Sequence, residues 1–408
     1  LGALDTNQLT ALSVSQVAAI STDDLQAIGS VAIQLLKTNQ IAGLTTDQVV
    51  ALTTVQVSSL TTKQLQSFSA SQMGAMETAD LVAIASADFA LLKSSQLSGL
   101  STSQIAALTT DQVDALTTAQ LPGLNTAMVV ALTTDQVGML DSTQINALSA
   151  AQISAMETED LVTLTSLQLA GLKSTQLAAM TTDQLVNLTT DQLSTLSTKA
   201  IVGLTSAQLG SLTTDQFSAL TTDQLPALTT SQLVGMRTDQ LQVLTTDQLK
   251  ALNTSGGLKW VSNDLIKAVT TAQIAVISSA SLATMSATQV AAIETEDLVI
   301  LSTDQLQGMS SAQLAGLTTD QLVALTTGQV TSLTTLQLSG LSSAQIRAIE
   351  TQDLVAITSS KFATLKSSQL AGLSTAQVSA LTTEQVFALK TAQLSGFGTA
   401  MIKSLTAA

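Results

Sequence analysis

A period of eight residues runs through the chain and constrains its fold more than any other feature. Written from Leu4, the units read LDTNQLTA, LSVSQVAA and ISTDDLQA, and this register continues to Leu252. One nine-residue unit, LNTSGGLKW, follows, and the period of eight resumes at Val261. Self-similarity at a fixed period is the sequence signature of a solenoid, so we expect one structural unit repeated about fifty times.

The consensus of this octad predicts a short helix with its own cap. Position 1 is Leu, positions 2 and 3 are Thr or Ser, position 5 is Gln, position 6 is Leu, Val or Ile, and position 8 is small. With position 2 as the N-cap, Gln at position 5 completes a capping box, and positions 1 and 6 form a hydrophobic staple. An N-cap at position 3 stays open as an alternative, because Thr is more uniform there.

The fold class that we predict is an all-α solenoid of very short capped helices. A period of eight would rotate its apolar stripe around a continuous helix, so the helix must restart in each unit. Such short helices do not form alone, and neighbouring units must bury positions 1 and 6. A β-solenoid is the alternative, because Pro122 and Pro226 fall at position 7, inside the expected helix. Enrichment in Leu and Ala over Val and Ile favours helix.

The spacing of charged residues suggests how the units stack. Four units carry Glu at position 2, each opening a Glu-Thr-x-Asp-Leu-Val stretch, and in three of them Lys follows sixteen residues later. If two octads make one superhelical turn, each Glu lies beneath its Lys. Copying by descent explains the spacing equally well, because the stretches from Asp80 and Asp353 are near-duplicates. The predicted inter-layer ion pairs are Glu77–Lys93, Glu157–Lys173 and Glu350–Lys366.

The irregular unit divides the chain into three predicted parts. Residues 1–252 and 261–408 are solenoid segments, and residues 253–260 are the break between them. Gly256, Gly257 and Trp260 mark this break. We expect Trp260 to fill the gap left by the broken repeat, and the alternative is that it anchors a partner.

The composition argues against several functional classes. The chain has no Cys and no His, which removes thiol nucleophiles, imidazole bases and the usual zinc ligands, so we expect no enzyme and no cofactor. A formal net charge of -15 opposes binding to nucleic acid. No apolar run is long enough to insert into a membrane. Weak calcium association remains open at the densest acidic groups, which are Asp23-Asp24, Glu157/Glu159/Asp160 and Glu294/Glu296/Asp297.

Two resemblances bear on function. The LTTDQ octads resemble the octapeptide repeats of large secreted surface proteins of proteobacteria, which are adhesin-like, surface-layer-like or filament-forming. This resemblance covers essentially the whole chain and implies an extracellular, architectural role. LTTDQVVAL, from Leu44 to Leu52, is similar to the first helix of a transcription-activator-like effector repeat. The period of eight and the missing base-reading loop mean that DNA binding is not implied.

These observations lead to one expected function and one alternative. We expect a non-enzymatic structural protein, located outside the cell or on its surface, that associates with itself into a filament, sheath or surface layer. Thr and Gln side chains are expected to form hydrogen bonds between neighbouring molecules. The alternative is an adhesin stalk or repeat module that binds a cell-surface ligand. Both ends of the chain read as cuts within something longer.

Overall fold

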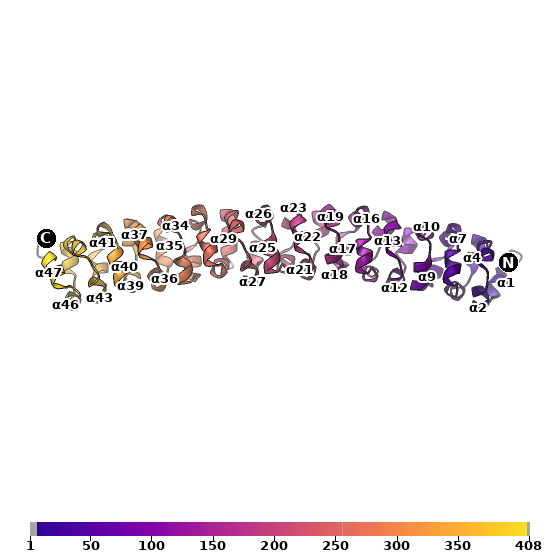
Figure 1. The fold of residues 1–408 in the computed structure, drawn as a ribbon, viewed down its shortest axis with the longest axis horizontal. Helices are drawn as coiled ribbons and strands as arrows, with labels where there is room; N and C mark the ends of the chain where they lie inside the picture. Colours follow the sequence, from indigo (N-terminus) through magenta and orange to yellow (C-terminus); the bar gives the residue numbers. More distant parts are fainter. Residues whose placement is uncertain (1–5, 255, 406–408) are drawn as a thin grey trace. The chain divides into compact units, whose positions relative to one another are not determined.

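The computed structural model describes residues 6–254 and 256–405. These residues form 47 short α-helices and three 3₁₀-helices, and no β-strand. This confirms the all-α solenoid and excludes the β-solenoid over the described residues. None of the described helices is long and apolar enough to cross a membrane. The chain divides into two compact units, Leu1–Leu204 and Thr205–Ala408, within which helices follow one another in chain order (Figure 1).

The helices of the first unit are α1 (Thr6–Ala11), α2 (Val14–Ala18), α3 (Thr22–Gln26), α4 (Ser30–Leu35), α5 (Thr38–Ala42), α6 (Thr46–Val50), α7 (Thr54–Ser59), α8 (Thr62–Leu65), α9 (Ala70–Ala75), α10 (Thr78–Val82), α11 (Ser86–Phe89), α12 (Ser94–Leu97), α13 (Thr102–Ala107), α14 (Thr110–Asp114), η1 (Leu121–Gly123), α15 (Thr126–Val130), α16 (Thr134–Met139), α17 (Ser142–Ala147), α18 (Ala150–Ala155), α19 (Thr158–Thr163), α20 (Ser166–Leu169), α21 (Ser174–Ala179), α22 (Thr182–Asn187), α23 (Thr190–Ser194) and α24 (Thr198–Ile201).

The helices of the second unit are α25 (Ser206–Ser211), α26 (Thr214–Ser218), η2 (Leu225–Ala227), α27 (Thr230–Leu233), α28 (Thr238–Gln242), α29 (Thr246–Thr254), η3 (Gly257–Trp260), α30 (Asn263–Lys267), α31 (Thr271–Ile274), α32 (Ser279–Thr284), α33 (Ala287–Val290), α34 (Thr295–Ile300), α35 (Thr303–Gly308), α36 (Ser311–Ala315), α37 (Thr319–Ala324), α38 (Thr327–Ser332), α39 (Thr335–Gly340), α40 (Ser343–Ala348), α41 (Thr351–Ala356), α42 (Ser359–Phe362), α43 (Ser367–Leu370), α44 (Thr375–Ser379), α45 (Thr383–Phe387), α46 (Thr391–Leu394) and α47 (Thr399–Leu405).

Most octads cap their own helix at position 2, as the consensus predicts. In α6, the backbone N–H of Gln48 donates to Thr45 Oγ1 at 3.2 Å, and the N–H of Thr45 donates to Gln48 Oε1 at 2.9 Å. This reciprocal pair is the capping box, which satisfies two backbone donors that the helix itself leaves unpaired. The N-cap therefore lies at position 2 and not at position 3.

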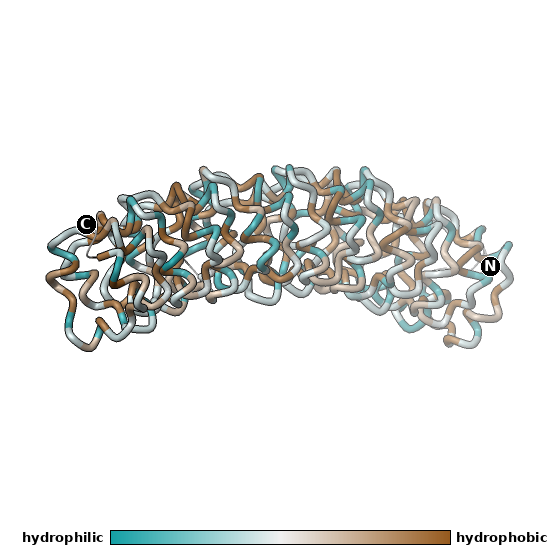
Figure 2. Tube along the Cα trace, turned by 60° about the vertical axis from the view of Figure 1, so that its left-hand side comes forward, coloured by the Kyte–Doolittle hydropathy of each residue, from teal (hydrophilic) through white to brown (hydrophobic). Residues whose placement is uncertain are grey.

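The core of both units consists of the apolar residues at positions 1 and 6. In the octad of α6, Val49 at position 6 is fully buried and Leu52, which opens the next octad, is 4% exposed. Hydrophobic and hydrophilic stretches accordingly alternate along the trace (Figure 2). Burying a Val or Leu side chain contributes about 1.5–3 kcal/mol, so each octad adds a similar increment of stability.

The glutamine at position 5 joins each octad to an earlier turn of the solenoid. The Nε2 group of Gln112 donates to the carbonyl oxygens of Leu81 at 3.0 Å and Ile84 at 2.9 Å, which lie 31 and 28 residues earlier. Its Oε1 atom accepts from the N–H of Thr109 at 3.0 Å. One buried side chain thus caps its own helix and bonds to the preceding layer. We call this recurring set of bonds the glutamine ladder.

The predicted stacking of two octads per superhelical turn is wrong. Helices in contact are three octads apart, as in α18 with α21 and α36 with α39. The ladder joins each glutamine to carbonyls 28 and 31 residues earlier. One turn therefore takes between three and four octads. A ring of three to four helices gives the side chains at positions 1 and 6 a common interior, which two helices would not enclose.

The described residues of the irregular segment, 253, 254 and 256–260, lie within the second unit. Gly256 has a φ of 74°, in the left-handed region that favours glycine, and η3 begins at the next residue, Gly257. Leu258 is 1% exposed and occupies the core. Trp260 is 48% exposed, and Lys259 Nζ lies 5.1 Å from the centre of its ring. Trp260 therefore lies at the surface and does not fill a gap, contrary to our expectation.

The glutamine ladder continues across this segment. Gln273 Nε2 donates to the carbonyls of Leu241 and Leu244, which lie 32 and 29 residues earlier instead of 31 and 28. Gln289 returns to the regular spacing, with bonds to Leu258 and Val261. The additional residue of the irregular unit therefore lengthens one layer by one residue, and the following layers keep the regular spacing. The division between the two compact units falls after Leu204, among regular octads.

The two prolines change the helix type without breaking the ladder. Pro122 lies in η1 and Pro226 lies in η2, where 3₁₀ turns replace the α-helix of other octads. Proline has no N–H group and is disfavoured inside an α-helix, which explains the change. Gln120 still donates to the carbonyls of Phe89 at 2.8 Å and Leu92 at 3.0 Å. The prolines therefore do not favour strands.

Candidate functional site

The predicted ion pairs are not formed in the described part of the chain. The salt bridges there are Arg237–Asp239, Lys250–Asp247 and Lys267–Asp264. The ammonium of Lys93 instead donates to the carbonyl of Gln66 at 3.2 Å, 27 residues earlier. The reason is the superhelical turn, because residues two octads apart do not lie in adjacent layers. The structure places all six predicted residues, Glu77, Lys93, Glu157, Lys173, Glu350 and Lys366, at N-cap positions.

The glutamate-bearing octads have a different property, which is an aspartate at position 5. The sequence Glu-Thr-x-Asp puts a carboxylate where most octads have the ladder glutamine, as Asp24 and Asp88 do in two octads without that glutamate. The aspartates of the Glu-Thr-x-Asp octads are 2–4% exposed. Their octads have no capping box, and the glutamate N-caps accept no side-chain hydrogen bond. The four residues are Asp80, Asp160, Asp297 and Asp353.

Three of these carboxylates, those of Asp80, Asp297 and Asp353, bond to a threonine hydroxyl 26 residues earlier, as Asp88 does in an octad without the glutamate. Thr54 Oγ1 donates to Asp80 Oδ1 at 2.7 Å, and Thr327 Oγ1 donates to Asp353 Oδ1 at 2.5 Å. The other oxygen of Asp80, Oδ2, is buried and has no hydrogen-bond partner. A buried acceptor without a donor is costly, so this oxygen requires an explanation.

Burial also affects the protonation of one of these groups. Desolvation raises the pKa of the Asp297 carboxyl above its ordinary value. The hydrogen bond from Thr271 lowers the pKa, and the negative charges of Glu294 and Glu296 raise it. The net direction is upward, because burial is the largest effect.

Among residues 6–254 and 256–405, no three acidic side chains are grouped so as to hold a metal ion by themselves. Any cation here would need backbone oxygens as further ligands. The acidic groups 157/159/160 and 294/296/297 each contain one buried carboxylate, Asp160 and Asp297. Sequence reasoning missed the role of position 5. The available signal was the replacement of an otherwise regular Gln by Asp in octads that also carry Glu at position 2.

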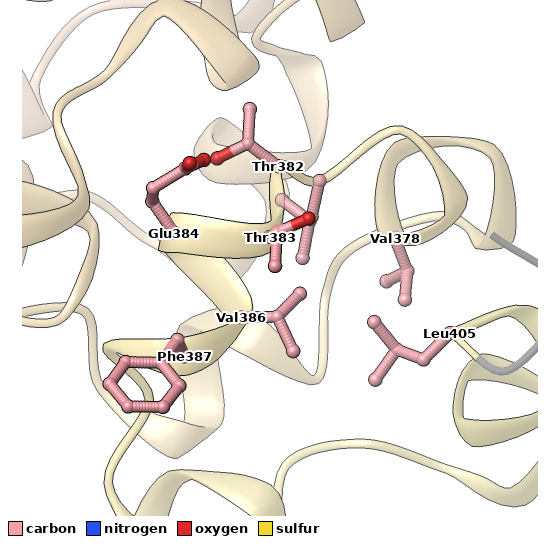
Figure 3. A pocket seen from close by; sticks show the side chains of 8 residues that line it. Val378, Thr382, Thr383, Glu384, Val386, Phe387 and Leu405 are labelled. Carbon is pink, nitrogen blue, oxygen red and sulfur yellow. The ribbon is translucent and has the colours of Figure 1, made fainter.

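An open groove of about 540 Å³ lies among α44, α45 and α47. Val378, Val386 and Leu405 face one another across it, and the Phe387 ring lies to one side (Figure 3). Phe387 is 91% exposed. Glu384 is the one carboxylate in the lining. An apolar groove with a single acid has no pair of groups for acid–base chemistry, so we assign it no catalytic role.

Comparison with known families identifies the repeat. The model of the ALTTAQ repeat matches nine segments, which together cover more than half of the chain. The chain belongs to the ALTTAQ repeat family. The matched segments are residues 17–54, 81–118, 113–150, 153–190, 186–222, 218–254, 290–327, 346–383 and 354–391. Each matched segment of this ALTTAQ repeat protein is longer than the 31 residues that separate a ladder glutamine from its acceptor.

Two solved structures show weak similarity to this ALTTAQ repeat protein. One is the leucine-rich repeat-containing protein LegL7 from Legionella pneumophila, at 15% identity over 69% of this chain and 84% of that chain, with a TM-score of 0.15. The other is the structure of APUM23-GGAAUUGACGG, at 11% identity over 97% of this chain and 96% of that chain, with a TM-score of 0.18. No curated protein matches the chain. TM-scores this low carry no argument about function.

Proposed function

We propose that this ALTTAQ repeat protein is a non-enzymatic structural protein of the cell exterior, which associates with itself into a filament, sheath or surface layer. The observation that carries the proposal is the glutamine ladder. It repeats the same bonds between layers throughout each unit, so length is gained by adding octads. The extracellular location rests on the resemblance of the LTTDQ octads to those of secreted surface proteins.

The mechanism of association differs from the one that the sequence suggested. The ladder glutamines are buried and bond to carbonyls of their own chain, so they do not join neighbouring molecules. Exposed apolar side chains at position 4 are a better basis for association. Their exposed fractions are 71% for Val31, 66% for Val55, 78% for Leu167 and 70% for Leu336. Burying such side chains between molecules would be favourable.

Sedimentation and negative-stain electron microscopy test this proposal. We expect the purified chain to form assemblies that grow with concentration and appear as filaments or sheets. The variant V31T/V55T/L167T/L336T should assemble less while keeping its helical circular dichroism, because these side chains lie outside the core. A chain that stays monomeric at all concentrations would contradict self-association. Saturable binding of that monomer to a glycan or cell-surface protein would support the adhesin alternative.

A further inference from the structure

The ladder glutamine occupies a cage of backbone carbonyl oxygens. Gln64 Nε2 lies 3.0 Å from the carbonyl oxygen of Ile33, 3.2 Å from that of Gln34 and 2.8 Å from that of Leu36. Gln329 Nε2 has the same three kinds of partner, at 2.8, 3.2 and 2.8 Å. These oxygens carry partial negative charge, so the cage favours a hydrogen-bond donor or a cation.

In the Glu-Thr-x-Asp octads, the residue at the ladder position is an acceptor instead of a donor, and in the first of them one buried oxygen has no partner. By the spacing of the ladder, the cage opposite Asp80 consists of the carbonyls of Val49, Val50 and Leu52. Asp is shorter than Gln by one methylene, about 1.5 Å, and an ionised carboxylate has no proton to donate. Asp80 is 2% exposed, and its Oδ2 atom has no partner. A positively charged group between the carboxylate oxygen and the carbonyl oxygens would interact favourably with both.

One octad of the chain already places a cation at such a cage. Lys361 stands at position 5 in place of Gln, and its Nζ atom donates to the carbonyl of Thr331 at 2.6 Å. Thr331 lies 30 residues earlier, which is the spacing of the middle carbonyl of the cage. A full positive charge is therefore compatible with this environment.

A second carboxylate accompanies each of these aspartates. Every octad with Glu at position 2 has Asp at position 5, and the glutamates are Glu77, Glu157, Glu294 and Glu350. Glu77 is the N-cap residue of α10, and its side chain makes no capping bond. Two carboxylates together with backbone carbonyls form an all-oxygen ligand set with two negative charges. Hard divalent cations, and Ca²⁺ above all, prefer such ligands.

We propose that the four Glu-Thr-x-Asp octads are Ca²⁺ sites, in which the Asp and Glu carboxylates and the carbonyl cage bind the ion. For the first site the ligands are Asp80, Glu77 and the backbone carbonyls of Val49, Val50 and Leu52, with water completing the coordination. Few charged ligands imply modest affinity, so the Kd should be about 0.1–1 mM, as in extracellular calcium modules. This inference does not depend on self-association.

Calorimetric titration of the full-length chain with CaCl₂, in calcium-free buffer at neutral pH, tests the proposal. We expect saturable binding and a rise in Tm in millimolar CaCl₂. The variant D80Q/D160Q/D297Q/D353Q restores the consensus glutamine and should fold. It should lose calcium binding and have a higher Tm than the wild-type chain without calcium, because amides then fill the cages.

A matched variant controls for net charge. D47N/D135N/D183N/D304N removes the same number of charges from exposed aspartates at position 4, and it should bind calcium like the wild-type chain. The proposal fails if the wild-type chain binds no calcium, if the Asp-to-Gln variant still binds it, or if KCl at equal ionic strength produces the same rise in Tm. If the Tm responds to pH and not to calcium, a proton and not Ca²⁺ lies between the carboxylate and the carbonyl oxygens. That result would also overturn the proposal.

Discussion

At position 5 of the octad, one glutamine acts as acceptor within its own helix and as donor to the preceding turn. Gln112 is 1% exposed and makes both sets of bonds, so its removal leaves the Thr109 N–H and the Ile84 carbonyl without these partners, and the Leu81 carbonyl keeps only its backbone bonds. Each buried polar group left unpaired costs about 1–3 kcal/mol. The amide should therefore contribute more to stability than any surface side chain of the octad.

Substitution of Gln112 tests this expectation. Gln112→Ala should lower the free energy of unfolding by about 2 kcal/mol or more. Gln112→Glu keeps the acceptor and loses the donor when ionised, so it should destabilise the protein more at neutral than at acidic pH. The exposed Gln34, at position 7, is the control, and Gln34→Ala should change Tm little. Equal Tm values for Gln112→Ala and Gln34→Ala would contradict the ladder.

The buried carboxyl of Asp297 predicts a pH dependence of stability. Its pKa is raised in the folded state, so the folded protein binds the proton more tightly than the unfolded chain does. The resulting stabilisation is present below the ordinary pKa of 3.8 and is lost as pH rises through the folded-state pKa. In calcium-free buffer, the Tm of wild type relative to Asp297→Asn should fall from about pH 3 to pH 7. A constant difference would contradict the raised pKa.

At the scale of the helices, small residues set how closely successive layers approach. A Cβ atom built on Gly99 would overlap the backbone carbonyl of Ala70, which lies in the adjacent helix α9. Gly138, within α16, has open space around the same position. The two glycines therefore differ in environment although both belong to regular octads.

Alanine substitutions distinguish these two environments. Gly99→Ala forces two helices apart and should lower stability by about 1–3 kcal/mol. Gly138→Ala should raise it by about 0.5–1 kcal/mol, because alanine is the better helix former. Thermal unfolding followed by circular dichroism measures both changes. Stabilisation by Gly99→Ala would show that the layers are not in close contact there.

Much of the helix structure is predictable from the octad alone. The N-cap, the capping box and the buried positions 1 and 6 depend on residues within eight of one another, which one unit displays in full. The superhelical turn depends on contacts 24–32 residues apart, between nearly identical units, so the pattern does not say which copies meet. The predicted ion pair between Glu77 and Lys93 is wrong for this reason. The sequence also predicts for Gln48 a capping role and bonds to neighbouring molecules, whereas its Nε2 atom bonds to the carbonyls of Val17 and Ile20 of the same chain.

At the scale of the whole molecule, equivalent octads make the chain tolerant of changes in length. Removing residues 180–187 deletes one complete octad of the first unit and leaves every later glutamine in register with some earlier carbonyl. Removing residues 180–183 shifts that register by half an octad. The first deletion should leave the helical circular dichroism per residue unchanged and lower the Tm only slightly. The second deletion should lower both quantities clearly. Equal damage by the two deletions would contradict a modular solenoid.

Disulfide cross-linking tests the central claim, that adjacent layers are three to four octads apart, most directly. The chain has no Cys, so any disulfide comes from introduced residues. A Cβ atom on Gly316 would lie 3.1 Å from that of Ala287, 29 residues earlier and near the separation that a disulfide bridges. The variant Ala287→Cys/Gly316→Cys should form an intramolecular disulfide on mild oxidation, seen as a mobility shift on a non-reducing gel. Ala287→Cys/Thr303→Cys, at the two-octad spacing, should not. The opposite result would contradict the account.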